Sequence, residues 1–296
     1  LIFMNLQSLW IASRPKTLIV SIAPVLLGLA LSLNKEVFSS TLVALLTLFA
    51  SIFIQLGTNY INDLYDYLSG ADDENRLGPI RVVQAGLLSQ NQIKKAALFS
   101  FGIALVIGIY LVFIGGIPIL LIGSFALISG YCYTGGPYPL GYNGLGDIFV
   151  FIFYGLIAVP GTYYLQSGTL DIDSIIVGSS IGFIAVAILC VNNIRDINTD
   201  HKVGKKTLAV RFGSTFVTIL YDCMIIFPYL CVLLLLTQHH FYLNLDLCLV
   251  FLSIPMAVKL IIDIHTKNGS DLNLVLYRTS NFMRLFFVLL LIGIYL

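Results

Sequence analysis

The chain has 296 residues, of which 58% are hydrophobic and only 10% charged, and its mean hydropathy is +0.95. Soluble domains carry about 25% charged residues, so this composition argues against a soluble enzyme and against a disordered chain. The formal net charge of +1 argues against a nucleic-acid partner, because such partners are bound by strongly basic surfaces. The composition predicts a multi-pass membrane protein in contact with lipid.

Nine apolar segments follow one another along the chain, each close to the roughly 20 residues that a membrane-spanning helix needs. Helices are expected rather than strands because lipid offers the backbone no other hydrogen-bond partner. No soluble linker interrupts the series, so we expect a single all-α domain over residues 1–296. The predicted spans are 17–33, 41–61, 94–114, 117–134, 147–165, 174–194, 215–236, 246–264 and 280–296.

The basic residues predict the orientation of these spans. If all nine cross the membrane, fourteen of the Lys and Arg residues share one side with the N-terminus, and only Lys35 lies on the other. Cytoplasmic segments are the ones that carry such an excess. We therefore expect a cell (inner) membrane protein whose N-terminus and two long polar connections face the cytoplasm.

The first long polar connection begins with the sequence NYINDLYDYLSGADDENRLGPIR, residues 59–81. If the second span continues as a helix past its apolar part, one side of it carries a polar stripe at three- and four-residue spacing. This stripe consists of Asn59, Asn62, Asp63 and Asp66, and Asp72 and Asp73 follow after Gly70.

The second long polar connection reads NNIRDINTDHKVGKKTLAVRFG, residues 192–213, in which Asn192, Asp196 and Asp200 recur at every fourth position. Carboxylates repeated on one helix face repel each other, and a divalent cation is the simplest compensation. Asp and Asn oxygens suit Mg²⁺ rather than zinc. Basic residues that could meet phosphate charge are interleaved with these acids: Arg76, Arg81, Arg195, Lys205, Lys206 and Arg211.

One such patch alone is most simply a solvated helix face. Two patches with the same order of Asn, Asp and basic residues, each at the cytoplasmic end of an apolar helix, favour a diphosphate held through Mg²⁺. A polyprenyl diphosphate matches this layout, because its tail belongs in hydrocarbon and its head group requires charge compensation.

Four further features lie outside these two patches. Asp147 is either a helix N-cap or a site residue, and Asp222 is an intramembrane acid with no obvious partner. Lys259 and Asp263 are expected to form a structural pair. A tyrosine cluster is suited either to stabilising a carbocation or to interfacial anchoring, and it comprises Tyr131, Tyr133, Tyr138 and Tyr142.

These motifs resemble the UbiA superfamily of intramembrane prenyltransferases, and within it the branch that acts on 1,4-dihydroxy-2-naphthoate. The superfamily's first motif is usually NDxxDxxxD, whereas Gly70 stands four residues after Asp66 here, a shift that the naphthoate branch shares. The resemblance runs nearly end to end, through ASRPKTLIVSIAPVLLGLAL (12–31), NDLYDYLSGADDENRLGPIR (62–81), YTGGPYPLGYNGLGDIFVFIFYG (133–155) and NNIRDINTDHKVGKKTLAVRFG (192–213).

The resemblance implies a nine-helix bundle around a central cavity with a polar cytoplasmic cap. It implies transfer of a prenyl chain from a polyprenyl or phytyl diphosphate to 1,4-dihydroxy-2-naphthoate, with loss of CO₂ and diphosphate, in menaquinone or phylloquinone biosynthesis. Two alternatives remain: a prenyltransferase acting on another aromatic acceptor of the 4-hydroxybenzoate type, and a secondary transporter that uses Asp222 and the loop acids as ion ligands.

We assign the candidate site residues accordingly. The expected Mg²⁺ ligands are Asn62, Asp66, Asp196 and Asp200, with Asp63 and Asp72 assisting. Asp66, Asp196, Asp200 and Lys205 are the expected catalytic residues. The expected substrate-binding residues are Arg76, Arg81, Asn192, Arg195, Lys205, Arg211 and Tyr133.

Overall fold

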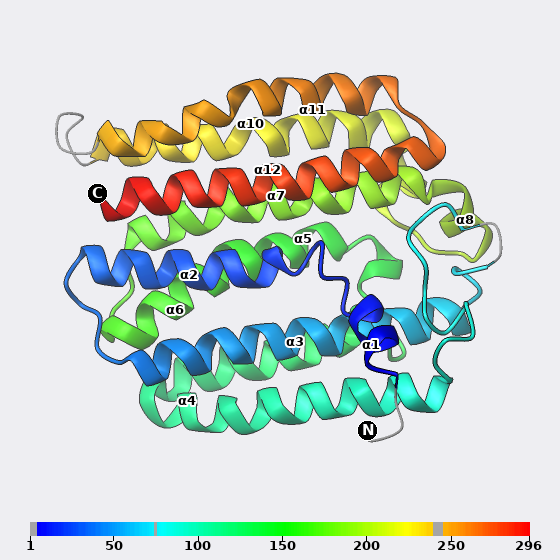
Figure 1. Cartoon of the computed structure of the whole chain (residues 1–296), viewed down its shortest axis with the longest axis horizontal. Helices are drawn as coiled ribbons and strands as arrows, with labels where there is room; N and C mark the ends of the chain where they lie inside the picture. The colour runs from blue at the N-terminus through cyan, green and yellow to red at the C-terminus, as the bar shows by residue number, and fades with distance from the viewer. Residues whose placement is uncertain (1–4, 74–75, 239–244) are drawn as a thin grey trace.

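The computed structural model describes residues 5–73, 76–238 and 245–296, and within these ranges every regular element is helical (Figure 1). The first half contains α1 (Leu6–Ala12), α2 (Ile19–Asn34), α3 (Thr41–Leu68), α4 (Gln90–Cys132), η1 (Gly141–Asn143), α5 (Gly146–Val150), η2 (Phe151–Ile157) and α6 (Ala158–Ser167). The second half contains α7 (Ile172–Arg195), α8 (Ile197–Lys202), α9 (Leu208–Phe212), α10 (Ser214–Gln238), η3 (Leu245–Ser253), α11 (Ile254–Thr266), η4 (Gly269–Asp271) and α12 (Leu272–Tyr295).

Seven helical segments in the described part of the chain are long and apolar enough to cross a membrane. They are α3, α4, the continuous run α5–η2–α6, α7, α10, the run η3–α11, and η4–α12. α2 is also apolar but has only 16 residues. The protein is therefore a multi-pass membrane protein, and its helices differ from the nine expected spans at α2 and at α4.

α4 covers two of the expected spans in a single 43-residue element. A straight helix of this length would be about 65 Å long, about twice the thickness of the hydrocarbon core. Gly116 interrupts it with a non-helical backbone (φ 65°, ψ −151°), and Pro118 follows. A Cβ placed on Gly130 would lie 3.4 Å from the ring of Phe101, so the two halves of α4 fold back against each other.

α7 lies inside the bundle, with α10 and α12 on one side and η2, α6 and α2 on the other (Figure 1). Its side chains Val177, Ile181 and Ile184 are fully buried. Glycine allows η2 to approach closely, since a Cβ on Gly178 would lie 2.1 Å from the carbonyl oxygen of Gly155. Small residues permit such close helix contacts in membranes.

The polar segments gather at one end of the bundle. The α3–α4 connection, α1 and α8 lie together at the right of Figure 1, whereas the short α2–α3 and α6–α7 connections lie at the opposite end. α3 continues beyond its apolar part to Leu68, as its polar stripe predicted. At the opposite end, Lys35 pairs with Asp171 and Asp173.

Candidate active site

Asp66 is the point at which three loops meet. It lies in the last turns of α3 and is buried. The Tyr142 hydroxyl donates to its Oδ1 at 2.9 Å, and Lys205 Nζ lies 3.2 Å from the same oxygen. Arg81 Nη2 lies 3.7 Å from the other oxygen. Groups 15 to 139 positions away in the chain are thus brought to one carboxylate.

Asp63, one turn earlier, has a different role. Its two carboxylate oxygens accept hydrogen bonds from the backbone N–H groups of Val82 and Val83, at 3.2 and 3.0 Å. The side chain is almost fully buried. Asp63 therefore fixes the loop that carries Arg81.

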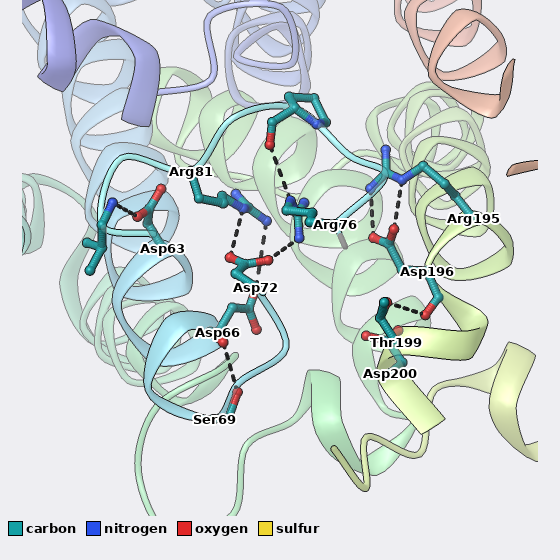
Figure 2. A network of polar contacts seen from close by, with 12 residues as sticks. Asp63, Asp66, Ser69, Asp72, Arg76, Arg81, Arg195, Asp196, Thr199 and Asp200 are labelled. Carbon is teal, nitrogen blue, oxygen red and sulfur yellow. Dashed lines mark hydrogen bonds and ion pairs between the residues drawn. The ribbon is translucent and has the colours of Figure 1, made fainter. Parts of the chain in front are cut away.

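Asp72 holds two arginines in place (Figure 2). Gly70, at φ 77°, ends α3 in the left-handed conformation that glycine adopts easily, and the chain then turns back so that the N–H of Asp72 donates to the Asp66 carbonyl oxygen. The Asp72 carboxylate pairs with Arg76 and, at 3.1 Å, with Arg81 Nε. Burial raises the pKa of the Asp72 carboxyl, and the charges of Arg81 and Arg76 oppose that rise.

The second polar connection begins where α7 ends. Arg195 forms two parallel hydrogen bonds with the Asp196 carboxylate, at 2.8 and 2.7 Å (Figure 2), and its third nitrogen donates to Asn273 on α12. Burial by itself would raise the pKa of Asp196, but the Arg195 hydrogen bonds and charge lower it overall. Asp196 is therefore an ionised carboxylate.

Lys205 joins the two acidic patches. Its Nζ lies 3.2 Å from Asp66 and 3.4 Å from Asp200, and it lies over the ring of Tyr142 at 4.8 Å from the centroid. Burial would lower the pKa of Lys205, but the two carboxylates outweigh it and raise that pKa above its ordinary value. Burial raises the pKa of Asp200 to about 6.

Two adjoining hollows lie in this region. A small polar pocket of about 100 Å³ is lined by acidic and basic side chains of both polar connections. A larger apolar cavity of about 480 Å³ is lined by residues of α2, α3, α4, η2, α6 and α7. The residues that line both hollows form what we call the neck: Arg14, Asn62, Tyr133, Leu189 and Asn192.

Most of the predicted site residues line the polar pocket, namely Asn62, Asp66, Arg76, Arg81, Tyr133, Asn192, Arg195, Asp196, Asp200 and Lys205. Asp63, Asp72 and Arg211 do not. Arg211 donates to the carbonyl oxygens of Lys206 and Asn143, which ties the second connection to the η1 loop. These three side chains are engaged in holding the loops.

The features outside the two patches are resolved individually. Asp147 is not the N-cap of α5; it lies buried in the first helical turn, 4.0 Å from the Cys190 thiol. Asp222 has a partner on α11, the His265 ring, at 2.8 Å. The expected Lys259–Asp263 pair is not formed, because Asp263 pairs with Arg278 on α12.

The four tyrosines of the cluster have different surroundings in the structure. Tyr142 contacts Asp66, Tyr133 lies at the neck, and the Tyr131 hydroxyl pairs with that of Tyr65. Tyr138 is 60% exposed, which suits an interfacial anchor.

The donor chemistry fits Mg²⁺, although no metal cage is preformed. Within the described ranges, no group of three or more Asp, Glu, His or Cys side chains is arranged to hold a metal ion. The pocket instead offers oxygen donors, chiefly carboxylate and amide oxygens, and each carboxylate lies next to a basic group. Mg²⁺ is usually held by one or two protein carboxylates, with water and substrate phosphate completing its shell. The residues therefore fit a Mg²⁺ ion whose ligands come partly from the protein and partly from a phosphate group.

Several residues of the site were not expected from the sequence. Arg14, one of the fourteen basic residues on the predicted cytoplasmic side, lies at the neck. Gln55 and Tyr154, which line the apolar cavity, are hydrogen-bonded to each other. A polar residue within an apolar span is the signal that indicates Gln55, but no comparable signal marks Arg14.

Comparison with known proteins identifies the family to which the sequence is similar. The sequence profile of the UbiA prenyltransferase family matches residues 21–292. A 1,4-dihydroxy-2-naphthoate octaprenyltransferase of Escherichia coli is 36% identical over 232 residues, which is 76% of this chain and 75% of the relative. The protein of the same name from Haemophilus influenzae is 38% identical over 218 residues, covering 71% of this chain and 70% of the relative.

Solved structures share the fold. A UbiA homologue from Archaeoglobus fulgidus, described as bound to DMAPP and Mg²⁺, aligns with a TM-score of 0.64 over 96% of this chain and 99% of the other. A digeranylgeranylglyceryl phosphate synthase aligns with a TM-score of 0.62 over 98% of both chains. The sequence identities are 15% and 18%, so this likeness concerns the fold alone.

Proposed function

Because the chain belongs to the UbiA prenyltransferase family, we propose that it transfers a prenyl chain from a polyprenyl or phytyl diphosphate to 1,4-dihydroxy-2-naphthoate. The observation that carries this proposal is the shared neck between a charged pocket and an apolar cavity. An amphipathic donor fits such a pair of hollows, with its diphosphate among the charges and its tail in the cavity. The names of the bacterial relatives support the naphthoate acceptor.

The diphosphate would be bound by the basic side chains of the polar pocket. Arg76, Arg81, Arg195 and Lys205 are each paired with a carboxylate, so their positions are fixed before substrate arrives. Guanidinium groups bind phosphate through paired hydrogen bonds. Binding therefore requires little rearrangement of these four side chains, which favours tight electrostatic recognition.

Asp66, Asp196 and Asp200, with the amide oxygen of Asn62, would hold Mg²⁺. When bound, the metal neutralises diphosphate charge and so favours its departure as a leaving group. Asp72 would assist by holding Arg76 and Arg81, and Asp63 by fixing the loop of Arg81.

In the reaction, the bond between the prenyl carbon and the diphosphate oxygen breaks, and the diphosphate takes the electron pair. A carbon–carbon bond forms between the prenyl carbon and the ring carbon that bears the carboxylate. The bond from this carbon to the carboxylate then breaks, CO₂ leaves, and the electron pair of that bond restores the aromatic ring. The apolar lining of the cavity excludes water, which would otherwise capture the allylic cation. The Tyr133 ring at the neck is placed to stabilise positive charge next to it.

For the membrane arrangement, we propose nine crossings around a central cavity: the seven long segments, with the halves of α4 counted separately, and the short α2. The polar end would face the cytoplasm and the bundle would lie in the cell membrane. The excess of Lys and Arg at that end supports this orientation.

The experiment that tests the function uses the purified full chain in lipid vesicles. Radiolabelled polyprenyl and phytyl diphosphates are supplied with 1,4-dihydroxy-2-naphthoate, 4-hydroxybenzoate or no acceptor, with Mg²⁺ or with a chelator. We expect a prenylated, decarboxylated naphthoquinol only with the naphthoate and Mg²⁺, and no product from Asp66→Ala or Asp196→Ala. Lys202→Gln, an exposed change in α8, is the matched control with wild-type activity.

If product formed with 4-hydroxybenzoate and not with the naphthoate, 4-hydroxybenzoate would be the acceptor. Full activity of either Asp variant, or full activity without divalent metal, would contradict the proposed site. Solute uptake by sealed vesicles with no prenylated product would favour a transporter instead.

A further inference from the structure

Arg14 is the only cationic side chain at the neck among the residues that the structure describes. The other basic residues of the polar pocket, which are Arg76, Arg81, Arg195 and Lys205, do not line the apolar cavity. A positive charge is thus present at the point where a prenyl donor and an aromatic acceptor would have to meet.

The Arg14 guanidinium has no hydrogen-bond or short ion-pair partner within the described part of the chain, and only the more distant charges of Asp63 and Asp66 attract it. Its Nε and Nη2 atoms are buried and make no hydrogen bond. The two carboxylates that attract it already accept other hydrogen bonds, Asp63 from backbone N–H groups and Asp66 from Tyr142 and Lys205. Burial and the charge of Arg81 lower the pKa of Arg14 to about 9, so it stays protonated at neutral pH. An unpaired buried charge is costly, which indicates that an anion binds there.

The backbone holds Arg14 in an unfavourable conformation. Its φ of 55° is left-handed, a conformation that is unfavourable for a non-glycine residue. Asn59 Nδ2 donates to the Ser13 carbonyl oxygen at 2.8 Å, and the Thr17 N–H donates to that of Arg14 at 3.0 Å. Such held strain is concentrated at binding sites.

A line of uncharged polar groups continues from Arg14 along the cavity wall. The Tyr154 hydroxyl donates to Gln55 Oε1, Gln55 Nε2 donates to Asn59 Oδ1 at 3.1 Å, and Asn59 reaches the residue before Arg14. All three side chains line the otherwise largely apolar cavity. A flat ring that carries hydroxyl groups and one carboxylate matches this surface.

We propose that Arg14 binds the carboxylate of the aromatic acceptor, and that Gln55 and Tyr154 face the acceptor's hydroxyl groups. The inference rests on the proposed function. If the donor diphosphate lies with the four paired basic residues of the pocket, its reacting carbon lies next to the neck. An acceptor anchored on Arg14 then presents its ring to that carbon.

The test uses the full chain in lipid vesicles with one polyprenyl diphosphate and two acceptors, 1,4-dihydroxy-2-naphthoate and 1,4-dihydroxynaphthalene, which lacks the carboxylate. Arg14→Gln, Arg14→Lys and the matched control Lys16→Gln are compared with the wild type. Hydrogen bonds to a charged group contribute about 1.5–3 kcal/mol, which corresponds to about 10- to 100-fold. We expect Arg14→Gln to reduce the ratio of kcat/KM for the acid to that for the diol by this factor.

The KM for the donor should not change in Arg14→Gln, and Arg14→Lys should recover part of the preference for the acid. Lys16→Gln, an exposed change two residues away, should keep the wild-type ratio. Equilibrium binding of the naphthoate to donor-free protein should weaken by a similar factor in Arg14→Gln, and thermal unfolding identifies any variant that fails to fold. If Arg14→Gln does not fold, Arg14→Lys provides the comparison, because its shorter, non-planar cation should lower the ratio.

If Arg14→Gln lost kcat/KM equally on both acceptors and its KM for the donor rose, Arg14 would be shown to bind the diphosphate. That result would overturn the inference. An unchanged acid-to-diol ratio, or no binding of the naphthoate by the wild type, would also overturn it. A wild type that prenylates neither acceptor would count against the proposed function itself.

Discussion

Asp63 and Asp66 lie one turn apart on the same helix, yet their carboxylates have different environments. Asp63 accepts two backbone hydrogen bonds, whereas Asp66 faces Lys205, Arg81 and the polar pocket. Spacing alone places both on one side of α3. Only the position of the folded-back loop decides which of them faces the site.

This difference predicts that replacing each aspartate with alanine has a different effect on stability and activity. Asp63→Ala leaves the Val82 and Val83 N–H groups without an acceptor, at about 1–3 kcal/mol for an unsatisfied buried group, so it should lower the Tm and weaken activity. Asp66→Ala should abolish prenyl transfer with a smaller change in Tm. Thermal unfolding and activity, measured on the same preparations, check the prediction. An Asp63→Ala protein as stable as the wild type would contradict it, and Asp63→Asn, which keeps one acceptor oxygen, should be intermediate.

A second prediction at the residue scale concerns Asp200. Burial raises its pKa to about 6 in the folded protein, above the value of about 3.9 expected for an unfolded chain. Its contribution to stability is therefore fully present below about pH 4 and is lost as the pH rises through about 6. Asp200→Asn, which has no proton to lose, should have a higher Tm than the wild type at pH 7.5, and the difference should shrink toward pH 5. A Tm difference that does not depend on pH would contradict the raised pKa of Asp200.

At the scale of elements, glycine decides how closely the helices approach. Gly28 of α2 faces Val159 and Thr162 on α6, and Gly178 and Gly182 of α7 face Gly155 in η2. A side chain at these positions would push the helices apart. η2 is a π-helical turn, and it carries Tyr154, which reaches Gln55 across the cavity.

Gly178→Ala should therefore destabilise the bundle, because its Cβ would lie 2.1 Å from the Gly155 carbonyl oxygen. Overpacking of this kind costs about 1–3 kcal/mol. Gly102→Ala is the matched control, since a Cβ there meets nothing within 4 Å. Thermal unfolding in detergent should show a lower Tm for Gly178→Ala alone. Equal Tm values for both variants would mean that the α7–η2 contact can relax.

At the scale of the whole molecule, the polar residues lie at one end of a long apolar body. The loops that carry the site are at that end (Figure 1), and the opposite end holds short connections fixed by the Lys35 cluster. This asymmetry suits an enzyme at one membrane face better than a transporter, whose coupling sites lie near the midplane.

The orientation can be tested with single cysteines. The native cysteines are at positions 132, 190, 223, 231 and 248 and would first be replaced. Thr169→Cys and Lys202→Cys place one exposed thiol at each end of the bundle. In sealed right-side-out vesicles, an impermeant maleimide should label position 169 at once and position 202 only after the membrane is opened. The reverse pattern would place the site on the outer face.

The helical class, the apolar segments, the two polar connections and most of the pocket residues could be predicted from the amino-acid sequence. These are local properties: run length, helical spacing and the side on which basic residues fall. The continuation of α3 to Leu68 followed from the spacing of Asn59, Asn62 and Asp66 in the same way.

Which of these residues contact each other depends on the tertiary structure. Asp263 pairs with Arg278 rather than with Lys259, Asp222 with His265, and Asp66 with Tyr142 and Lys205. Each partner comes from a different helix or loop, and its distance depends on how the helices are rotated and how the loops fold back. Arg14 lies at the neck for the same reason, because only the folded chain brings it beside Asn62 of α3 and Asn192 of α7, which line both hollows with it.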